Sequence, residues 1–323
     1  MILILSETYD NITDEVCRWL NFYNAKYIRI NECFVNYSFS LALSNEKITP
    51  ILYIRDKEIP LSSISVSWFR RGYFNFINNL ESQENNIFKY VSNVKYRDFK
   101  CFSEYLYYYL KHNTKCFGYP QKYNINKLEV LDNAVKEGFR IPNSIIVQNY
   151  KELENLYIAN DGKVITKAIT DWSSSSYLDA YSYSNTTKEI DLDDIPKTFF
   201  YSLFQQQIPK SFEVRTFVWD NKIYSAAIYV TPDNVQARID FRNSYDTIKI
   251  VPYKLPENIN NRLLSLMNNF GLESGSADFI VDDDMNYWFL EINPVGQFDF
   301  VDKYCNYGLA HIIAKKLIEY ADK

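Results

Sequence analysis

The sequence contains little glycine, and this excludes the loops that most often hold a nucleotide. Only 8 of the 323 residues are glycine, and neither a GxxxxGK(S/T) loop nor a GxGxxG turn is present. If the protein binds a nucleotide, lysine and arginine side chains must hold the phosphates instead.

Cysteine is also scarce. The 5 cysteines are odd in number, widely scattered and free of any CxxC spacing. Neither a disulfide framework nor a zinc site is therefore predicted, and we interpret the cysteines as reduced core residues. They are Cys17, Cys33, Cys101, Cys116 and Cys305.

Neither a strong excess of one charge nor a long hydrophobic run is present. The 35 basic and 40 acidic side chains leave a formal charge of −5, which would not concentrate nucleic acid or an anionic membrane at the surface. No stretch approaches the ~20 apolar residues of a membrane span, and the opening Met1–Leu5 is too short for a signal peptide. We expect a cytoplasmic protein that binds neither nucleic acid nor membrane.

At 323 residues the chain is long enough for two or three compact domains, and its 47% of hydrophobic residues is ample for their cores. Residues 1–118 alternate short apolar runs with helical patterns, as in an open α/β domain. The predicted strands are 1–5, 51–54 and 64–69, and the predicted helices are 14–23 and 87–110. On the first helix, Val16, Trp19, Leu20 and Tyr23 share the face expected to be buried.

Residues 119–204 are predicted to form a small central α/β domain after a linker at Phe117–Pro120. Asn126 and Glu129 have the spacing of a capping box at the start of a helix, which Gly138 would end. The pattern further predicts a strand at 163–168, a polar loop at 171–176 and a short helix at 195–204.

Residues 205–323 are predicted to form a strand-rich domain closed by helices. Strands at 213–219 and 223–230 flank the turn Asp220-Asn221, a hairpin signal. Helices are expected at 258–270 and 309–320.

The most informative segment is a second hairpin, in residues 276–294. A turn centred between Asp284 and Met285 would place Asp278 directly opposite Glu291, and the strand period of two would put Asn293 on the same face. Two facing carboxylates repel unless a cation lies between them, and oxygen ligands of this kind suit Mg²⁺. We predict a magnesium site at Asp278, Glu291 and Asn293.

A solvated hairpin with chance alignment of its acids is the alternative to a metal site. It accounts for Asp282–Asp284, which we interpret as turn residues. It accounts poorly for Glu291 and Asn293, which interrupt an apolar strand that ends at Pro294. The metal site is therefore favoured.

Several cationic residues are candidates for holding phosphates. Lys127 begins the capped helix, and Lys167 precedes the serine loop around Ser174, whose hydroxyls and amides could cover phosphates. Taken singly, each lysine is more often a simple exposed element end. Arg215 and Arg242 are equally consistent with phosphate contacts and with ordinary ion pairs.

In this order, the motifs resemble those of the ATP-grasp superfamily. Lys127 and Lys167 are similar to its two phosphate lysines, and the motifs around Arg215 and Arg242 to the paired arginines of its ribosomal-protein glutamate ligase branch. Asp278, Glu291 and Asn293 coincide with its magnesium ligands. The segment 205–210 looks like the hinge that grips adenine, and the resemblance implies nucleotide contacts by Gln206, Gln207, Ile208, Lys210 and Glu213.

Within the superfamily the chain most resembles the maturases that make microviridin-type ribosomal peptides, the grasp-with-spasm group. The resemblance depends on Trp68–Gly72, Asp240–Arg242 and Phe289–Phe298. It implies an ATP-grasp fold, with Mg-ATP (two magnesium ions) as cofactor. It also implies a ribosomally made precursor peptide as partner, whose Asp or Glu side chain is activated as an acylphosphate and joined to Thr, Ser or Lys. Ser173–Ser176 and Gln206 depart from residues common in the superfamily.

Other interpretations stay open at this point. A ligase acting on a free amino acid or a protein tail is the nearest rival, and an ATP-binding module without catalysis is a weaker one. The resemblance suggests a homodimer. The segment around 189–204, with Asp191, Asp193 and Asp194 at its acidic start, could bind a leader peptide or be a solvated loop. Arg70 and Arg71 could orient an acidic peptide or form buried ion pairs.

Overall fold

The computed structural model describes residues 1–31, 36–74, 86–118, 125–169, 187–230 and 248–323. The chain divides into two compact units. The first comprises Met1–Tyr123, Leu272–Ser274 and Gly308–Lys323, and the second comprises Asn124–Gly271 and Gly275–Tyr307. The predicted central and C-terminal domains therefore both contribute to the second unit, and the last helix belongs to the first. The three-domain division itself stays a prediction.

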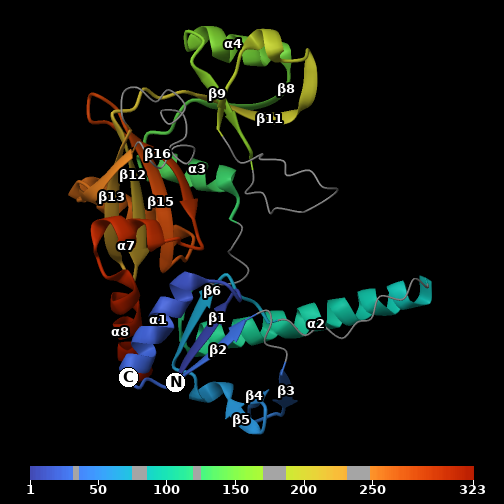
Figure 1. The fold of residues 1–323 in the computed structure, drawn as a ribbon. Helices are drawn as coiled ribbons and strands as arrows, with labels where there is room; N and C mark the ends of the chain where they lie inside the picture. The colour runs from blue at the N-terminus through green and yellow to red at the C-terminus, as the bar shows by residue number, and fades with distance from the viewer. Residues whose placement is uncertain (32–35, 75–85, 119–124, 170–186, 231–247) are drawn as a thin grey trace. The chain divides into compact units, whose positions relative to one another are not determined.

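The first unit is built on a four-stranded parallel sheet with the order β2-β1-β6-β7 (Figure 1). Its strands are β1 (Ile2–Ser6), β2 (Tyr27–Asn31), β6 (Val66–Arg70) and β7 (Lys115–Phe117). All five residues of β1 are buried, which explains the uninterrupted apolar run Ile2–Leu5: a parallel strand covered on both faces has no solvent side.

Helices and a small second sheet cover this sheet. Leu3 and Leu5 pack in one core cluster with Leu106 and Leu110 of the long helix α2, while α8 contacts β1 and β6 and also packs against α1. The helices are α1 (Asn11–Phe22), α2 (Asn86–Asn113) and α8 (Leu309–Ala321). The antiparallel sheet consists of β3 (Tyr37–Leu43), β4 (Ile48–Ile54) and β5 (Lys57–Pro60), followed by the single turn η1 (Leu61–Ser63).

The predicted buried face of α1 was half wrong. Val16 and Leu20 are fully buried, but Trp19 and Tyr23 remain 37% and 38% exposed. Cys17 is buried in their place. The helical period was read correctly, but Trp19 and Tyr23 lie at the edge of the stripe, where their rings contact His311 of α8 and keep part of their surface exposed.

The second unit begins with an antiparallel sheet of order β10-β9-β11-β8. Its strands are β8 (Ser144–Asn149), β9 (Val164–Lys167), β10 (Lys188–Glu189) and β11 (Thr198–Gln206), and its helical segments are α3 (Lys127–Lys136), α4 (Tyr150–Ala159) and η4 (Leu192–Asp194). The helix predicted at 195–204 was wrong. That segment is mostly strand β11, because the aromatic-rich run is paired on both edges, with β8 and β9.

A five-stranded antiparallel sheet of order β14-β13-β12-β15-β16 completes the second unit. Its elements are β12 (Phe212–Trp219), β13 (Lys222–Val230), β14 (Ile248–Tyr253), α6 (Glu257–Asn269), β15 (Ser274–Val281), β16 (Tyr287–Asn293) and α7 (Asp299–Cys305). Asp220 and Asn221 both have positive φ, 49° and 61°, so they form the predicted tight hairpin turn.

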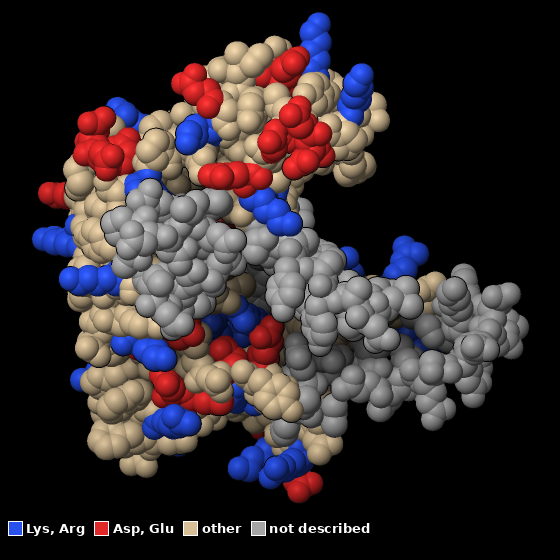
Figure 2. Space-filling model, turned by 45° about the horizontal axis from the view of Figure 1, so that its top comes forward, with Lys and Arg blue, Asp and Glu red and all other residues tan. Residues whose placement is uncertain are grey.

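The surface agrees with the composition. Acidic and basic side chains lie interspersed on the face shown in Figure 2. No helix in the described part of the chain is both long and apolar enough to cross a membrane. The four described cysteines are all free; Cys17 and Cys305 are buried as predicted, but Cys101 is exposed, while Cys33 lies outside the described residues.

Candidate active site

The acidic hairpin has the predicted cross-strand pairing. Strands β15 and β16 are antiparallel, Asp278 faces Glu291, and Ser276 faces Asn293. Glu291 and Asn293 are two residues apart on one strand, so their side chains share a face with Asp278. Two carboxylates and one amide are thus gathered on one two-stranded ribbon.

The route to this register differs from the prediction. Val281 faces Tyr287 and Phe279 faces Phe289, so the turn is centred on Asp284. With a regular ladder Asp278 would then face Leu290. A β-bulge between the Phe279 and Asp278 pairs accommodates Leu290 as one extra residue and restores the pairing of Asp278 with Glu291.

The turn is stabilised by Asp282, one of the three acids assigned to the hairpin tip. Its carboxylate accepts hydrogen bonds from the backbone N–H groups of Asp284 and Asn286 at 3.1 and 2.8 Å and from the indole of Trp288 at 2.8 Å. Burial alone would raise the pKa of Asp282, but these donors lower it below its usual value. Asp282 is therefore a turn residue and not a metal ligand.

Both facing acids are neutralised by cations. Nζ of Lys127 lies 3.1 Å from Oε2 of Glu291, and Nη1 of Arg215 lies 3.3 Å from Oδ2 of Asp278. All four side chains are between 16% and 32% exposed, so these charges interact in a partly dehydrated environment. The structure brings together four of the predicted site residues.

Local capping positions Lys127. Asn126 accepts a hydrogen bond from the backbone N–H of Leu128 at 2.9 Å, so α3 begins at Lys127 as predicted, and α3 packs against β16. Lys127 therefore extends from the first turn of a helix toward Glu291. Arg215 extends from β12, where Thr216 exchanges hydrogen bonds with the backbone of Ala277 and fixes β12 against β15.

Asn293 lies at the end of the same ribbon. Its Oδ1 accepts a hydrogen bond from the backbone N–H of Val295 at 3.0 Å, which holds the side chain in place beside the acids. In the described residues no group of three His, Cys, Asp or Glu side chains is placed to hold a metal. The candidate set here contains two acids and an amide. Such hard oxygen donors fit Mg²⁺, which retains waters and needs few protein ligands.

The predicted adenine hinge, residues 205–210, is hydrogen-bonded to the residues that precede strands β8 and β9. The backbone N–H groups of Gln206 and Gln207 donate to the carbonyl groups of Asn143 and Lys163, at 2.8 and 2.9 Å. These two amides are therefore already engaged, and an adenine contact at this hinge would have to use other groups. Ile208 is 6% exposed, so its side chain belongs to the core.

The remaining predicted residues are placed as follows. Lys210 and Glu213 form an ion pair with each other and are 8% and 14% exposed. Lys167 ends strand β9, opposite Leu203. Ser174 and Arg242 lie outside the described residues. Sequence reasoning missed the ion pairs Lys127–Glu291 and Arg215–Asp278 and the bulge at Leu290. Each of them depends on neighbours that the local sequence does not reveal.

Comparisons with known proteins agree with this fold. No protein-family model and no curated protein sequence matches the chain. Among solved structures, a RiPP-associated ATP-grasp ligase of Chryseobacterium gregarium, in complex with ADP and a leader and core peptide, is 25% identical, with a TM-score of 0.80 over 99% of this chain and 96% of that chain. The macrocyclase MdnC of Microcystis aeruginosa MRC, bound with a precursor peptide, is 24% identical, with a TM-score of 0.74 over 99% and 100% of the two chains.

A third structure, the ATP-grasp ligase PsnB complexed with minimal precursor, Mg and ADP, shares the fold at 14% identity, with a TM-score of 0.72 over 100% of this chain and 98% of that chain. The predicted ATP-grasp α/β fold is confirmed, and the chain is an ATP-grasp ligase. Within that class it is grouped with the ligases that mature ribosomally made peptides, as the sequence motifs indicated.

Proposed function

We propose that the protein is an ADP-forming ligase that closes rings in a ribosomally made precursor peptide. It would use ATP to convert an Asp or Glu side chain of the peptide into an acylphosphate. A Thr or Ser hydroxyl, or a Lys amine, would then attack that acyl group and release phosphate. The product would be a side-chain ester or amide.

The observation that carries this proposal is the reciprocal pairing of Lys127 with Glu291 and of Arg215 with Asp278. In the structure these two cations neutralise the two acids. A magnesium-bound triphosphate offers both groups better partners: metal for the carboxylates and phosphate oxygens for the lysine and arginine. The site is thus matched in charge to Mg-ATP without any glycine-rich loop.

The residues divide into two roles under this proposal. Asp278, Glu291 and Asn293 would hold magnesium, with Glu291 bridging two ions, and the metal would neutralise charge on the phosphates. Lys127 and Lys167 would hold phosphates. Arg215 and Arg242 would hold the transferred phosphoryl group and then the acylphosphate, since phosphoryl transfer depends chiefly on positioning and charge. Ser174, Gln206, Gln207, Ile208, Lys210 and Glu213 stay predictions as nucleotide contacts.

The structures most similar to this one support a peptide as substrate, because the Chryseobacterium ligase was observed with a leader and core peptide and the Microcystis macrocyclase with a precursor peptide. We propose the same class of partner here, and a cytoplasmic location, where ATP is available. A homodimer and leader binding by residues 189–204 stay predictions.

The test is incubation of the protein with Mg-ATP and the short peptide encoded beside its gene, followed by mass spectrometry. Each bond formed should remove one water from the peptide and release one ADP. A parallel incubation with free glutamate and a protein tail distinguishes the rival ligase. Addition of mass to the tail, with the precursor unchanged, would exclude ring closure.

A further inference from the structure

A second cluster of charged side chains lies in the first unit, where the parallel strands end. It contains three acid–arginine pairs, contributed by β2, β6 and α1 and by the segments that follow β1 and β6. The pairs are Asp14 with Arg29, Asp10 with Arg70, and Glu7 with Arg71. The Arg70–Asp10 pair is buried and Arg29 is held by several partners, whereas the Arg71–Glu7 pair differs in exposure, contacts and backbone conformation.

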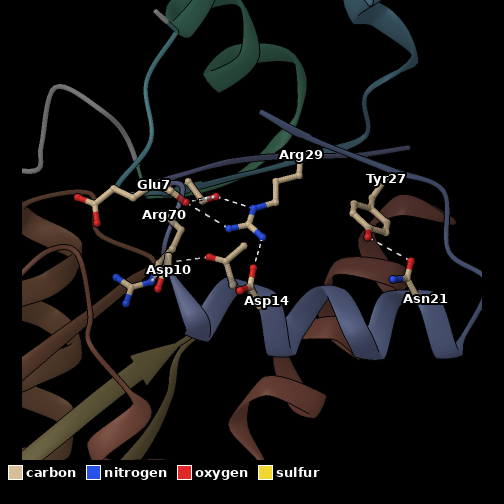
Figure 3. Close-up of polar contacts among 9 residues, drawn as sticks. Glu7, Asp10, Asp14, Asn21, Tyr27, Arg29 and Arg70 are labelled. Carbon is tan, nitrogen blue, oxygen red and sulfur yellow. Dashed lines mark hydrogen bonds and ion pairs between the residues drawn. The ribbon is translucent and has the colours of Figure 1, made fainter. Parts of the chain in front are cut away.

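Arg29 and Arg70 form ion pairs and hydrogen bonds within the first unit (Figure 3). Arg29 pairs with Asp14 and also donates to Ser6 Oγ at 2.7 Å and to the backbone carbonyl of Glu7 at 3.2 Å. Arg70 is 1% exposed, with its Nε 3.4 Å from Asp10, whose carboxylate also accepts from the Thr13 hydroxyl at 2.7 Å. This resolves the alternative left open for Arg70: it forms a buried ion pair.

Arg71 is accessible and weakly held. Its side chain is 29% exposed, and its only ion pair in the described residues is a single contact of 3.6 Å with Glu7, which is itself 44% exposed. In Figure 3 the Glu7 carboxylate points away from Arg29. A partly solvated, single-contact pair of this kind is worth little and exchanges readily for a better anion.

The backbone at Arg71 is held in an uncommon conformation. Its φ is 60°, in the left-handed region, which is strained for a residue other than glycine. The next residue, Gly72, lies so close to β1 that a Cβ atom would be 2.2 Å from the backbone nitrogen of Ser6. The chain therefore folds back over the end of β1, and Arg71 forms an isolated antiparallel bridge with Ser6.

The location favours ligand binding. Strand β1 is flanked by β2 on one side and β6 on the other, so the strand order reverses at β1. In open parallel sheets, ligands bind outside the carboxyl ends of the strands at such a reversal. Ser6, Glu7, Arg70 and Arg71 are the residues at those ends.

We propose that Arg71 is a specificity residue that binds an acidic side chain of the substrate peptide. The guanidinium group would leave Glu7 and form a bidentate pair with the peptide carboxylate, which the single contact to Glu7 does not provide. Glu7 pairs with the guanidinium group until the peptide arrives and competes with the peptide carboxylate thereafter. The identity of the ligand as a peptide rests on the proposed function.

Three variants distinguish binding from a structural role, because the two roles predict different signs. If the pair were only structural, Arg71→Ala and Glu7→Gln would act in the same direction. If Arg71 binds carboxylate, Arg71→Ala weakens binding by on the order of tenfold and Glu7→Gln strengthens it about 2–5-fold, since the competing acid is gone. Arg71→Lys keeps the charge but loses the bidentate geometry, so it should fall between Arg71→Ala and the parent.

The measurement is ligand-observed NMR titration of the full chain, without nucleotide, using N-acetyl-glutamate N-methylamide and its uncharged glutamine analogue. The parent should bind the acid in preference to the amide, and Arg71→Ala should lose that preference. Arg18→Ala, which removes an exposed arginine of α1, serves as the matched control and should bind like the parent.

Equal affinities in the parent and Arg71→Ala, or weaker binding in Glu7→Gln, would overturn the inference. Because no ATP is present and no product is counted, this result is independent of whether the protein closes rings. Circular dichroism of each variant verifies that the fold is retained.

Discussion

Lys127 on helix α3 and Glu291 on strand β16 are 164 positions apart in sequence, and their charged groups lie 3.1 Å apart. The contact joins the start of a capped helix to the acidic ribbon. The candidate phosphate lysine and the candidate metal ligand are therefore in direct contact. A cation thus already sits at one of the two carboxylates where we expect magnesium to bind.

Replacing Glu291 with Gln should abolish ATP turnover while leaving the fold intact. Gln is isosteric, so packing is retained, but the loss of one negative charge removes the proposed bridge between two ions. We expect ADP release in the presence of peptide to fall at least about a hundredfold, as when one charge-stabilising group is lost. Asp283→Asn, at the hairpin tip, is the matched control. Undiminished ADP release from Glu291→Gln would refute the assignment.

Replacing Lys127 with Ala should have opposite effects on two ligands. Mg²⁺ alone should bind more tightly, because the competing cation beside Glu291 is gone. ATP should show a KM raised about tenfold, because a charge-assisted contact to phosphate is lost. Calorimetry with MgCl₂ and steady-state kinetics give the two values.

Lys136→Ala is the matched control for that variant, since Lys136 lies on the same helix and pairs only with Asp132 in the described part of the chain. An unchanged KM for ATP in Lys127→Ala would mean that the lysine serves only to neutralise Glu291. Lys127→Ala should lower the free energy of unfolding by at most about 1 kcal/mol, because the Lys127–Glu291 pair is partly solvated.

The acidic ribbon shows how much of the site could be predicted. The alternation of polar and apolar residues placed Asp278, Glu291 and Asn293 on one face, and the structure has them there. The bulge at Leu290 could not be predicted, since an alternation of polar and apolar residues does not show where an extra residue enters a strand. The right pairing was thus reached from a turn position that was slightly wrong.

The errors elsewhere have a common physical cause. Residues 195–204 carry a pattern that suits either a short helix or a strand, and pairing with β8 and β9 decides for the strand. On α1 the period was right, and Trp19 and Tyr23 contact His311 of α8 while part of their surface stays exposed. The strand pairing in the first case and the contact with α8 in the second both come from elements that are separate in sequence.

Asp282→Asn should destabilise the protein at neutral pH but not at low pH. The hydrogen bonds from Trp288, Asn286 and Asp284 lower the pKa of Asp282 in the folded state. A lowered folded-state pKa means that the carboxylate contributes stability above its unfolded pKa of about 4, and that this contribution is lost as the pH falls through the folded value. The difference in Tm between parent and variant should therefore be present at pH 7 and shrink at pH 3. A constant difference would contradict this account.

Gly72→Ala should be among the most damaging single substitutions in the first unit. The added Cβ would lie 2.2 Å from the nitrogen and 2.7 Å from the Cα of Ser6, both backbone atoms of a fully buried strand that cannot move aside. Overpacking against backbone costs about 1–3 kcal/mol or more, and it would also displace the neighbouring Arg71.

Gly308→Ala is an informative control, because Gly308 has a φ of +68° but nothing within 4 Å of an added Cβ. That variant should lose only about 1 kcal/mol, from backbone strain alone. Urea unfolding of both variants gives the comparison, and a Gly72→Ala variant as stable as Gly308→Ala would show that β1 and the Arg71 segment can separate without cost.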